Sequence, residues 1–377
     1  MEQIGLTGCK SYDYEEIRRA VDFLWDTLSF SRLVKPGMTA VIKPNLVMKS
    51  GPEGGVATHP LLVAAVGTKL KELGADVIVA ESPGGPYTPT ALRIIYGGCG
   101  YLEMSEKYGI PLNYDCSYSD AEAPDGVRSH HFQIINPILN ADLIVDVAKL
   151  KTHCMTGFSG AVKNMFGTIP GLMKPELHCR FPEKPDFCEM VIDLCELVRP
   201  QISFVDGVIG MEGNGPTGGT PRFVGALLAG TNPYALDLAC TKIISMKQSD
   251  ALLTAPAARR GIGPESMDEV EVLGDKLEDY RIPDFRQPES RTSDFVLDYV
   301  PKFLRPAAKK ILTPIPKIRE SDCVGCGRCA QSCPQHTIQI VKHVAKINYQ
   351  DCIRCYCCHE MCPERAIDIK RFSLFKL

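Results

Sequence analysis

The hydrophobic and polar positions of the first 250 residues alternate between two patterns. Some segments carry apolar residues at helical spacing, and others are short β-branched runs that end at glycine, proline or polar residues. The first pattern predicts helices at residues 14–28, 60–73, 186–198 and 234–244. The second predicts strands at residues 39–42, 76–80, 141–147, 202–205 and 223–229. Short buried strands that alternate with helices favour an α/β fold, so we expect a mainly parallel sheet domain with flanking helices over residues 1–250.

The pattern changes after residue 250. Residues 251–317 are rich in proline and charge, which predicts an irregular extension and linker. Basic residues within 302–317 alternate with apolar ones, so this stretch is either a solvated connector or a segment that docks to a partner or a membrane surface. We expect a second, smaller α+β domain at residues 318–377.

Composition excludes several classes of protein. The chain has 377 residues, of which 45% are hydrophobic and 23% are charged, and 42 Lys+Arg against 45 Asp+Glu give a formal net charge of −3. This balance excludes a generic polyanion binder, so we expect no nucleic acid partner. We find neither a secretory signal pattern nor an apolar run long enough to span a bilayer. The expected compartment is therefore cytoplasmic, with no transmembrane segment.

Eight of the 17 cysteines form two matching runs near the end of the sequence. The first run has the pattern C-x2-C-x2-C-x3-C-P and comprises Cys323, Cys326, Cys329 and Cys333. The second run has the same pattern and comprises Cys352, Cys355, Cys358 and Cys362. This internal duplication resembles the bacterial two-cluster ferredoxin over residues 316–377, and such a domain is ferredoxin-like in fold.

The resemblance implies two [4Fe–4S] clusters. On that pattern the fourth cysteine of each run binds the partner cluster. One site would use Cys323, Cys326, Cys329 and Cys362. The other would use Cys352, Cys355, Cys358 and Cys333. The alternative is zinc, which also binds C-x2-C pairs. Exposed clusters are oxygen-sensitive, so an anaerobic setting is expected.

Polar residues collect where the predicted strands end, and four of them are candidate catalytic residues. Lys149, Lys151 and His153 alternate, so an extended backbone places them on one face. Two lysines suit a carboxylate or phosphate substrate, and His153 can transfer protons near neutral pH. Glu81 ends another strand as a general base or as one half of a structural ion pair. The alternative for Lys149, Lys151 and His153 is a structural role at the strand end.

Other polar residues are candidates for binding a ligand or cofactor. Lys43 and Asn45 alternate directly after the first strand, and Lys163 and Asn164 follow the lysine-rich strand end. His59 is either a ligand or the cap of a helix that begins at Pro60.

A glycine-rich segment at residues 210–219 follows another predicted strand. Its backbone N–H groups can hold an anion, with Glu212, Gly213 and Gly215 as candidate residues, although the segment matches neither phosphate-binding motif and a structural turn is the alternative. His178 is a weaker candidate. Cys154 is either a thiolate nucleophile or a buried thiol.

Several phrases of the first 245 residues resemble the domain-of-unknown-function family 362, whose members are often joined to ferredoxin-like domains. The residues that carry this resemblance are 43–47, 58–60, 81–84, 149–153, 157–164, 178 and 206–219. The family implies no settled reaction.

We therefore expect an iron–sulfur oxidoreductase in which two [4Fe–4S] clusters pass electrons to an α/β domain that binds an anionic small molecule. A redox partner protein or a low-potential electron carrier would supply the electrons. A flavin or another organic cofactor has no fingerprint in the sequence. Two alternatives stay open: an electron carrier without catalysis of its own, and a non-redox isomerase with structural clusters.

Overall fold

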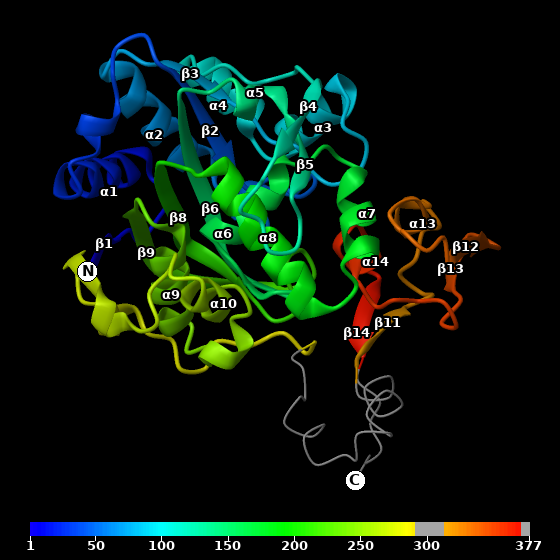
Figure 1. Ribbon diagram of the computed structural model, residues 1–377. Coiled ribbons are helices and arrows are strands. Elements are labelled where there is room, and N and C mark those ends of the chain that lie inside the picture. The colour runs from blue at the N-terminus through cyan, green and yellow to red at the C-terminus, as the bar shows by residue number, and fades with distance from the viewer. Residues whose placement is uncertain (291–312, 371–377) are drawn as a thin grey trace.

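The computed structural model describes residues 1–290 and 313–370, and most of these residues surround one large sheet (Figure 1). This sheet has eight strands, and the order along it is β10-β1-β9-β8-β6-β2-β3, with β7 paired to β6. The strands are β1 (Glu2–Gly8), β2 (Thr39–Pro44), β3 (Asp76–Val79), β6 (Leu143–His153), β7 (Gly157–Ser159), β8 (Ile202–Glu212), β9 (Thr220–Gly230) and β10 (Val270–Gly274). A separate hairpin pairs β4 (Tyr118–Glu122) with β5 (His131–Ile135).

The sheet is mixed but mainly parallel, as predicted. β3, β2, β6 and β8 form a parallel set, and β10 is parallel to β1. β9 runs antiparallel to both β8 and β1, and so joins the two parallel parts. The parallel set brings the carboxyl ends of β2, β3 and β6 to the same edge, where ligands of open α/β sheets bind.

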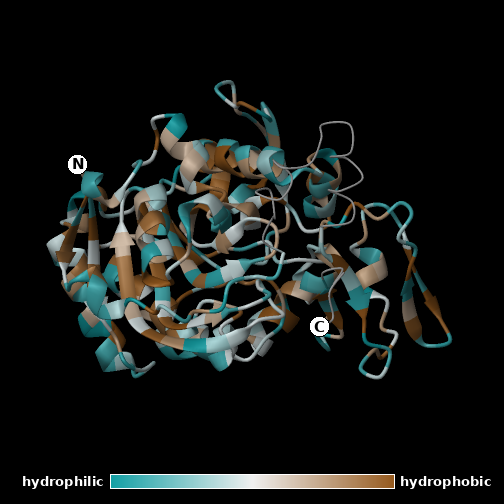
Figure 2. Ribbon diagram, turned by 90° about the horizontal axis from the view of Figure 1, so that it is seen from below, coloured by the Kyte–Doolittle hydropathy of each residue, from teal (hydrophilic) through white to brown (hydrophobic). Residues whose placement is uncertain are grey.

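Helices cover both faces of the sheet (Figure 1). Neighbouring positions on one strand point to opposite faces, and Ile42 packs in the cluster that contains α1 and α2, whereas Val41 packs in the cluster that contains α8. Apolar residues accordingly concentrate between the layers (Figure 2). The longer helices are α1 (Tyr14–Thr27), α2 (Pro60–Glu72), α3 (Pro89–Gly98), α4 (Tyr101–Tyr108), α7 (Met173–Arg180), α8 (Lys184–Val198) and α9 (Pro233–Ile243). Shorter ones are α5 (Asn136–Leu139), α6 (Ala161–Asn164) and α10 (Thr254–Arg259).

The cysteine-rich part forms a smaller α+β unit beside the large one (Figure 1). Two small antiparallel sheets pair β11 with β14 and β12 with β13, and each cysteine run contributes one helix of four residues. The elements are β11 (Ile315–Ile318), α13 (Arg328–Gln331), β12 (Ile338–Val341), β13 (Val344–Ile347), α14 (Cys357–Glu360) and β14 (Ile367–Lys370). This arrangement confirms the predicted fold class.

The predicted extension contributes to the large sheet. Residues 251–290 form α10 and the edge strand β10, so the sheet continues past residue 250. Most of the predicted basic stretch at 302–317 falls within residues 291–312, outside the described part of the chain. None of the helices within residues 1–290 and 313–370 is long and apolar enough to cross a membrane.

Candidate functional site

A polar cavity lies where β2, β3 and β6 end. Asn45 follows β2 directly, Glu81 lies two residues beyond β3, and Lys151 and His153 belong to the end of β6. The cavity has a volume of about 700 Å³ including its open mouth. Residues of α7 and α14 line it as well, so the cavity lies between the α/β part and the cysteine-rich part.

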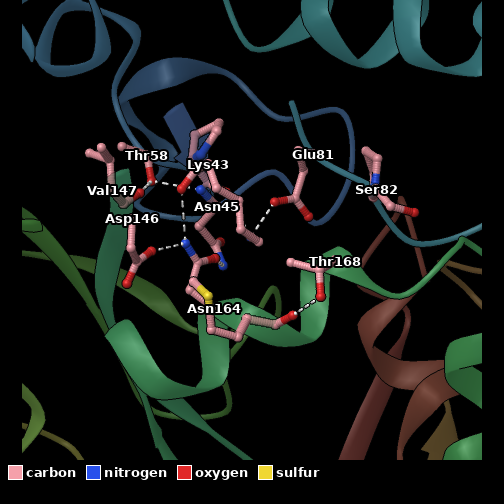
Figure 3. A network of polar contacts seen from close by, with 12 residues as sticks. Lys43, Asn45, Thr58, Glu81, Ser82, Asp146, Val147, Asn164 and Thr168 are labelled. Carbon is pink, nitrogen blue, oxygen red and sulfur yellow. Dashed lines mark hydrogen bonds and ion pairs between the residues drawn. The ribbon is translucent and has the colours of Figure 1, made fainter. Parts of the chain in front are cut away.

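A buried ion pair forms at one side of this cavity (Figure 3). Lys43 Nζ lies 2.5 Å from Glu81 Oε2, and neither side chain is more than 5% exposed. Burial raises the pKa of Glu81 to about 7, against the opposing effect of the Lys43 charge. A Cβ at position 167 would overlap both charged groups, so a larger residue there would displace the pair from this geometry. Of the two roles predicted for Glu81, the structure contains the ion pair, and the raised pKa leaves the base role open.

Asn164 connects two neighbouring strands, β2 and β6, through its side-chain amide (Figure 3). Its Nδ2 donates to Asp146 Oδ1 at 2.6 Å and to the backbone oxygen of Lys43 at 3.2 Å. Its Oδ1 accepts from Asn45 Nδ2 at 3.0 Å. Asn45 therefore turns its Oδ1 toward Lys151. Burial raises the pKa of Asp146 well above its usual range.

Lys151 is buried without a carboxylate beside it. Its Nζ donates to Asn45 Oδ1 at 2.6 Å and to the backbone oxygen of Val56 at 2.7 Å, and both acceptors are neutral. Burial, together with the charge of the nearby Lys163, lowers the pKa of Lys151 to about 7. Lys151 can therefore exchange a proton near neutral pH.

Lys163 is the second cation of the cavity that no carboxylate neutralises. Its Nζ lies 4.1 Å from the ring centre of Phe166, and no ion pair to it forms within residues 1–290 and 313–370. Burial lowers the pKa of Lys163 to about 8, opposed by the charge of Glu360. The buried Asp237 carboxylate holds this helix, α6, by accepting from the backbone N–H groups of Ala161 and Val162 at 2.7 and 3.2 Å.

His153 faces the cysteine-rich part. Its Nδ1 accepts from the backbone N–H groups of Met155 and Thr156 at 3.0 and 3.3 Å, which assigns the proton of the neutral ring to Nε2. Nε2 lies 3.3 Å from Glu360 Oε1. Burial lowers the pKa of His153 well below its usual range, and burial raises the pKa of Glu360. A neutral imidazole and a carboxyl group thus meet at the boundary of the two parts.

The cavity includes polar residues of α7 as well. Lys174 Nζ donates to the backbone oxygens of Ser82 and Ile169, both at 2.6 Å, and burial lowers its pKa to about 7. The sequence pattern gave no signal for Lys174. His178, the weaker candidate, stacks on Phe187 with 4.3 Å between ring centres. His178 Nδ1 has no hydrogen-bond partner among the described residues.

Lys149 and His59 lie outside the cavity lining. Lys149 stands opposite Asp206 in the sheet, and its Nζ lies 2.8 Å from Asp206 Oδ2 and 2.7 Å from Tyr12 Oη. The alternation places Lys149 on the same side of β6 as Lys151, but two residues deeper in the sheet, where Asp206 neutralises it. His59 Nδ1 accepts from Leu61 N at 3.3 Å, so the structure contains the helix cap among the two roles predicted for His59.

The glycine-rich loop also lies outside the cavity, apart from Pro216. Glu212 Oε1 accepts from Arg286 Nε at 2.8 Å, and Gly213 N donates to the backbone oxygen of Arg286 at 2.7 Å. Gly215 N donates to the backbone oxygen of Gly213 at 3.0 Å. The chain thus uses the predicted anion-binding groups, Glu212, Gly213 and Gly215, for its own contacts.

That loop is the surface on which α14 docks. Thr217 Oγ1 donates to the backbone oxygen of Glu360 at 2.9 Å, and His359 Nε2 lies 2.9 Å from the backbone oxygen of Asn214. A Cβ at position 218 would overlap the His359 ring, so glycine allows the close approach.

The structure brings four of the eight predicted ligand cysteines to one place. Cys323, Cys326, Cys329 and Cys362 line one small cavity. Cys358 interacts electrostatically with the other three cysteines, Cys352, Cys355 and Cys333, and also with Cys329 of the first set. Within the described residues no three candidate ligands converge as they would around a single metal ion. Thiolates on a four-iron cube stand farther apart than around one ion, because each binds a different iron, so the four-cysteine cavity fits such a group.

Two comparisons identify related families. The family described as domain of unknown function (DUF362) matches residues 40–242, and the 4Fe–4S dicluster domain matches residues 315–363. Thylakoid-associated protein sll1697 from Synechocystis sp. is 29% identical over 267 residues, which are 70% of this chain and 81% of that protein.

Two solved structures are distantly similar. The lactate racemase apoprotein from Thermoanaerobacterium thermosaccharolyticum has a TM-score of 0.41 at 15% identity, covering 65% of this chain and 58% of that one. A protein from Thermotoga maritima has a TM-score of 0.35 at 11% identity, covering 60% of this chain and 57% of that one. The chain thus spans less than two thirds of either structure, and the similarity is too distant to indicate a shared activity.

Proposed function

Because the chain belongs to the DUF362 family and carries a 4Fe–4S dicluster domain, we propose that it is a redox protein that binds an anionic small molecule between its two parts. The dicluster domain would receive electrons from a redox partner protein or a low-potential carrier. The α/β part would hold the molecule that accepts or donates them.

One observation carries this proposal: both parts of the chain line the same cavity. The α/β part contributes Lys151 and Lys163, and α14 contributes Cys357 and Glu360. Cys357 is the sequence neighbour of Cys358, a predicted cluster ligand. A molecule in this cavity would therefore lie beside a cluster, and short separation is what electron transfer requires.

The charges of the cavity favour an anion. Lys43 is neutralised by Glu81, and Lys174 is surrounded by backbone oxygens. Among residues 1–290 and 313–370, by contrast, no carboxylate forms an ion pair with Lys151 or Lys163. A buried cation without a counterion is costly, and a carboxylate or phosphate group of a ligand would remove that cost.

The cysteines that line the small cavity would hold one [4Fe–4S] cluster, and the remaining four would hold the other. When bound, each cluster takes up and releases one electron at a time. The protons that accompany electrons would come from the residues of the larger cavity. Lys151 and Glu81 each have a pKa of about 7, and His153 presents its Nε2 proton.

The first test measures the binding of acetate and of inorganic phosphate to the full chain purified without oxygen. Titration calorimetry of wild type is compared with Lys163→Met, which removes one of the two cavity cations that form no ion pair among the described residues. We expect affinity to fall by roughly 10- to 100-fold, because a charge-assisted hydrogen bond contributes about 1.5–3 kcal/mol. The control is Lys71→Met, whose exposed Nζ contacts only the backbone oxygen of Gly109. Equal affinities in wild type and Lys163→Met would contradict the anion site.

The second test addresses the redox part. The proposal expects about eight iron atoms per chain and loss of visible absorbance when dithionite is added. Native mass spectrometry of the same preparation would reveal any retained small molecule as mass beyond iron and sulfide. Clusters that load fully and resist reduction would instead support a non-redox enzyme. Lys151 and Glu81 could transfer protons in such an enzyme, because each has a pKa of about 7.

A further inference from the structure

A row of hydrogen-bonded side chains runs from the buried Asp146 to the large cavity (Figure 3). Asp146 Oδ1 accepts from Asn164 Nδ2 at 2.6 Å, and Asn164 Oδ1 accepts from Asn45 Nδ2 at 3.0 Å. Asn45 Oδ1 then accepts from Lys151 Nζ at 2.6 Å. Asp146 itself is fully buried and does not line the cavity. A carboxyl group outside the cavity is thus connected to a lysine that lines it.

The two ends of this row determine the orientation of both amides. At one end, Asp146 Oδ1 and the backbone oxygen of Lys43 are acceptors, so Asn164 must turn its NH2 group toward them. At the other end, the Lys151 ammonium can only donate, so Asn45 must turn its oxygen toward it. The two assignments agree in the middle, where Asn45 donates to Asn164. Reversing either amide would place two donors or two acceptors against each other.

Asp146 and the backbone of Asn45 hold the row in place. Asp146 Oδ1 can accept whether the carboxyl group is ionised or carries a proton on Oδ2, and Oδ2 has no hydrogen-bond partner among residues 1–290 and 313–370. Asn45 N donates to Thr58 Oγ1 at 3.0 Å, and Thr58 Oγ1 donates to the backbone oxygen of Val147 at 2.7 Å. The backbone of Asn45 is therefore attached to β6, and the direction of its amide depends on Asn164.

The direction of the row determines what Lys151 can offer to a ligand. An ammonium group has three N–H donors. Lys151 donates to Asn45 Oδ1 and to the backbone oxygen of Val56, so one N–H is left without an acceptor in the described part of the chain. Lys151 lines the cavity, where this N–H can contact an oxygen of a bound anion. With the amide of Asn45 reversed, Lys151 would face an NH2 group and lose its contact at 2.6 Å.

We propose that Asp146 is a positioning residue for Lys151. Acting through the two amides, it holds the ammonium group so that the third N–H faces an oxygen of the bound anion. This inference rests on the anion site of the proposed function. It gives a role in binding to a carboxyl group that the anion does not touch.

The test is a double-mutant cycle, in which titration calorimetry measures acetate affinity of the full chain purified without oxygen. Asp146→Leu removes the anchor and keeps the branched shape of the side chain. Acetate affinity should fall by about 3- to 10-fold, the effect of one neutral hydrogen bond. In a Lys151→Met background the same substitution should cause no further loss, because the residue that it positions is gone. In a Lys163→Met background it should cause the full loss.

Two further variants separate positioning from a general effect on folding. Asn164→Ala breaks the row one link nearer to Lys151 and should show the same dependence on the two backgrounds. Asp146→Asn keeps an oxygen at the Oδ1 position, so it should retain most of the affinity that Asp146→Leu loses. If Asp146→Leu does not fold, Asn164→Ala decides by the same criteria.

Three results would overturn the inference. They are an unchanged affinity in both Asp146→Leu and Asn164→Ala, equal losses in the Lys151→Met and Lys163→Met backgrounds, and an Asp146→Asn variant that binds as weakly as Asp146→Leu. Wild type separates this test from the proposed function. A wild-type chain that binds neither acetate nor inorganic phosphate contradicts the function and the inference together, whereas wild-type binding with any of the three results contradicts only the role of Asp146.

Discussion

Two buried lysines on β6 show how neighbouring positions take different roles. Lys149 and Lys151 are two residues apart, and both are essentially inaccessible to solvent. Lys149 pairs with the carboxylate of Asp206, whereas Lys151 contacts an amide oxygen and a backbone oxygen. The first charge is balanced by the protein itself. The second has no carboxylate partner among the described residues, and under the proposed function an anion in the cavity would balance it. The partner rather than the lysine would then distinguish a structural position from a binding position.

The largest expected effect is the loss of stability in Lys149→Met. This substitution leaves Asp206 buried without its cation, and breaking a buried pair in this way costs about 3–5 kcal/mol. We expect a clear fall in the thermal unfolding midpoint, measured by circular dichroism on protein purified without oxygen. Arg222→Met is the control, because it breaks the exposed pair with Asp284, and exposed pairs contribute about 0–1 kcal/mol. Equal losses of stability in Lys149→Met and Arg222→Met would contradict the structural role of the buried Lys149–Asp206 pair.

An intermediate effect is expected when Lys151 is given a carboxylate. In Asn45→Asp, an acidic oxygen would replace the amide oxygen that lies 2.6 Å from Lys151 Nζ. The cavity would then resemble the Lys149 site, and acetate affinity should fall by about 10-fold or more, the loss expected for one charge-assisted contact. The exposed Asn140→Asp adds the same charge away from the cavity and should keep wild-type affinity. Acetate binding that survives in Asn45→Asp would argue against Lys151 as an anion-binding group.

The smallest effect is a graded dependence on pH. Lys151 and Lys163 have pKa values of about 7 and about 8, so each is protonated below and neutral above its value. A neutral amine attracts an anion weakly, and acetate stays ionised throughout this range. Acetate affinity measured by calorimetry should therefore be highest near pH 6 and fall by up to about tenfold between pH 6 and pH 8, as Lys151 loses its proton. Affinity that is constant or rises between pH 6 and 9 would contradict the assignment.

The elements of the α/β part were largely predictable, because each buried strand or amphipathic helix shows its own periodicity. The helix predicted at residues 14–28 is Tyr14–Thr27, and the strand predicted at 39–42 is Thr39–Pro44. β1 and β10 were not predicted. β10 has a mixed burial pattern at the edge of the sheet, where the hydrophobic signal is weak. Both resemblances, to family 362 and to the dicluster domain, are confirmed.

The site was predictable only as far as local sequence determines it. Strand alternation placed Lys151 and His153 at the sheet edge where the cavity lies. The partner of Lys149 is Asp206 on β8, and the sequence around Lys149 does not reveal this pairing. Glu360 and Lys174 reach the cavity through the docking of α14 and α7, which are distant in sequence from β6. The sequence predicts that the glycine-rich loop binds an anion, because glycines allow a ligand to approach the backbone closely. In the structure, α14 is the group that approaches this loop closely.

One wall of the cavity is a helix that begins at Cys357, inside the second cysteine run. Such a short helix is held mainly by what surrounds it, and the cysteines before and after it would be fixed by iron. A newly made chain without iron would therefore have an incomplete cavity. Under the proposed function, metal supply would then act as a checkpoint during maturation, because the protein would gain its ligand only when it could also exchange electrons with it.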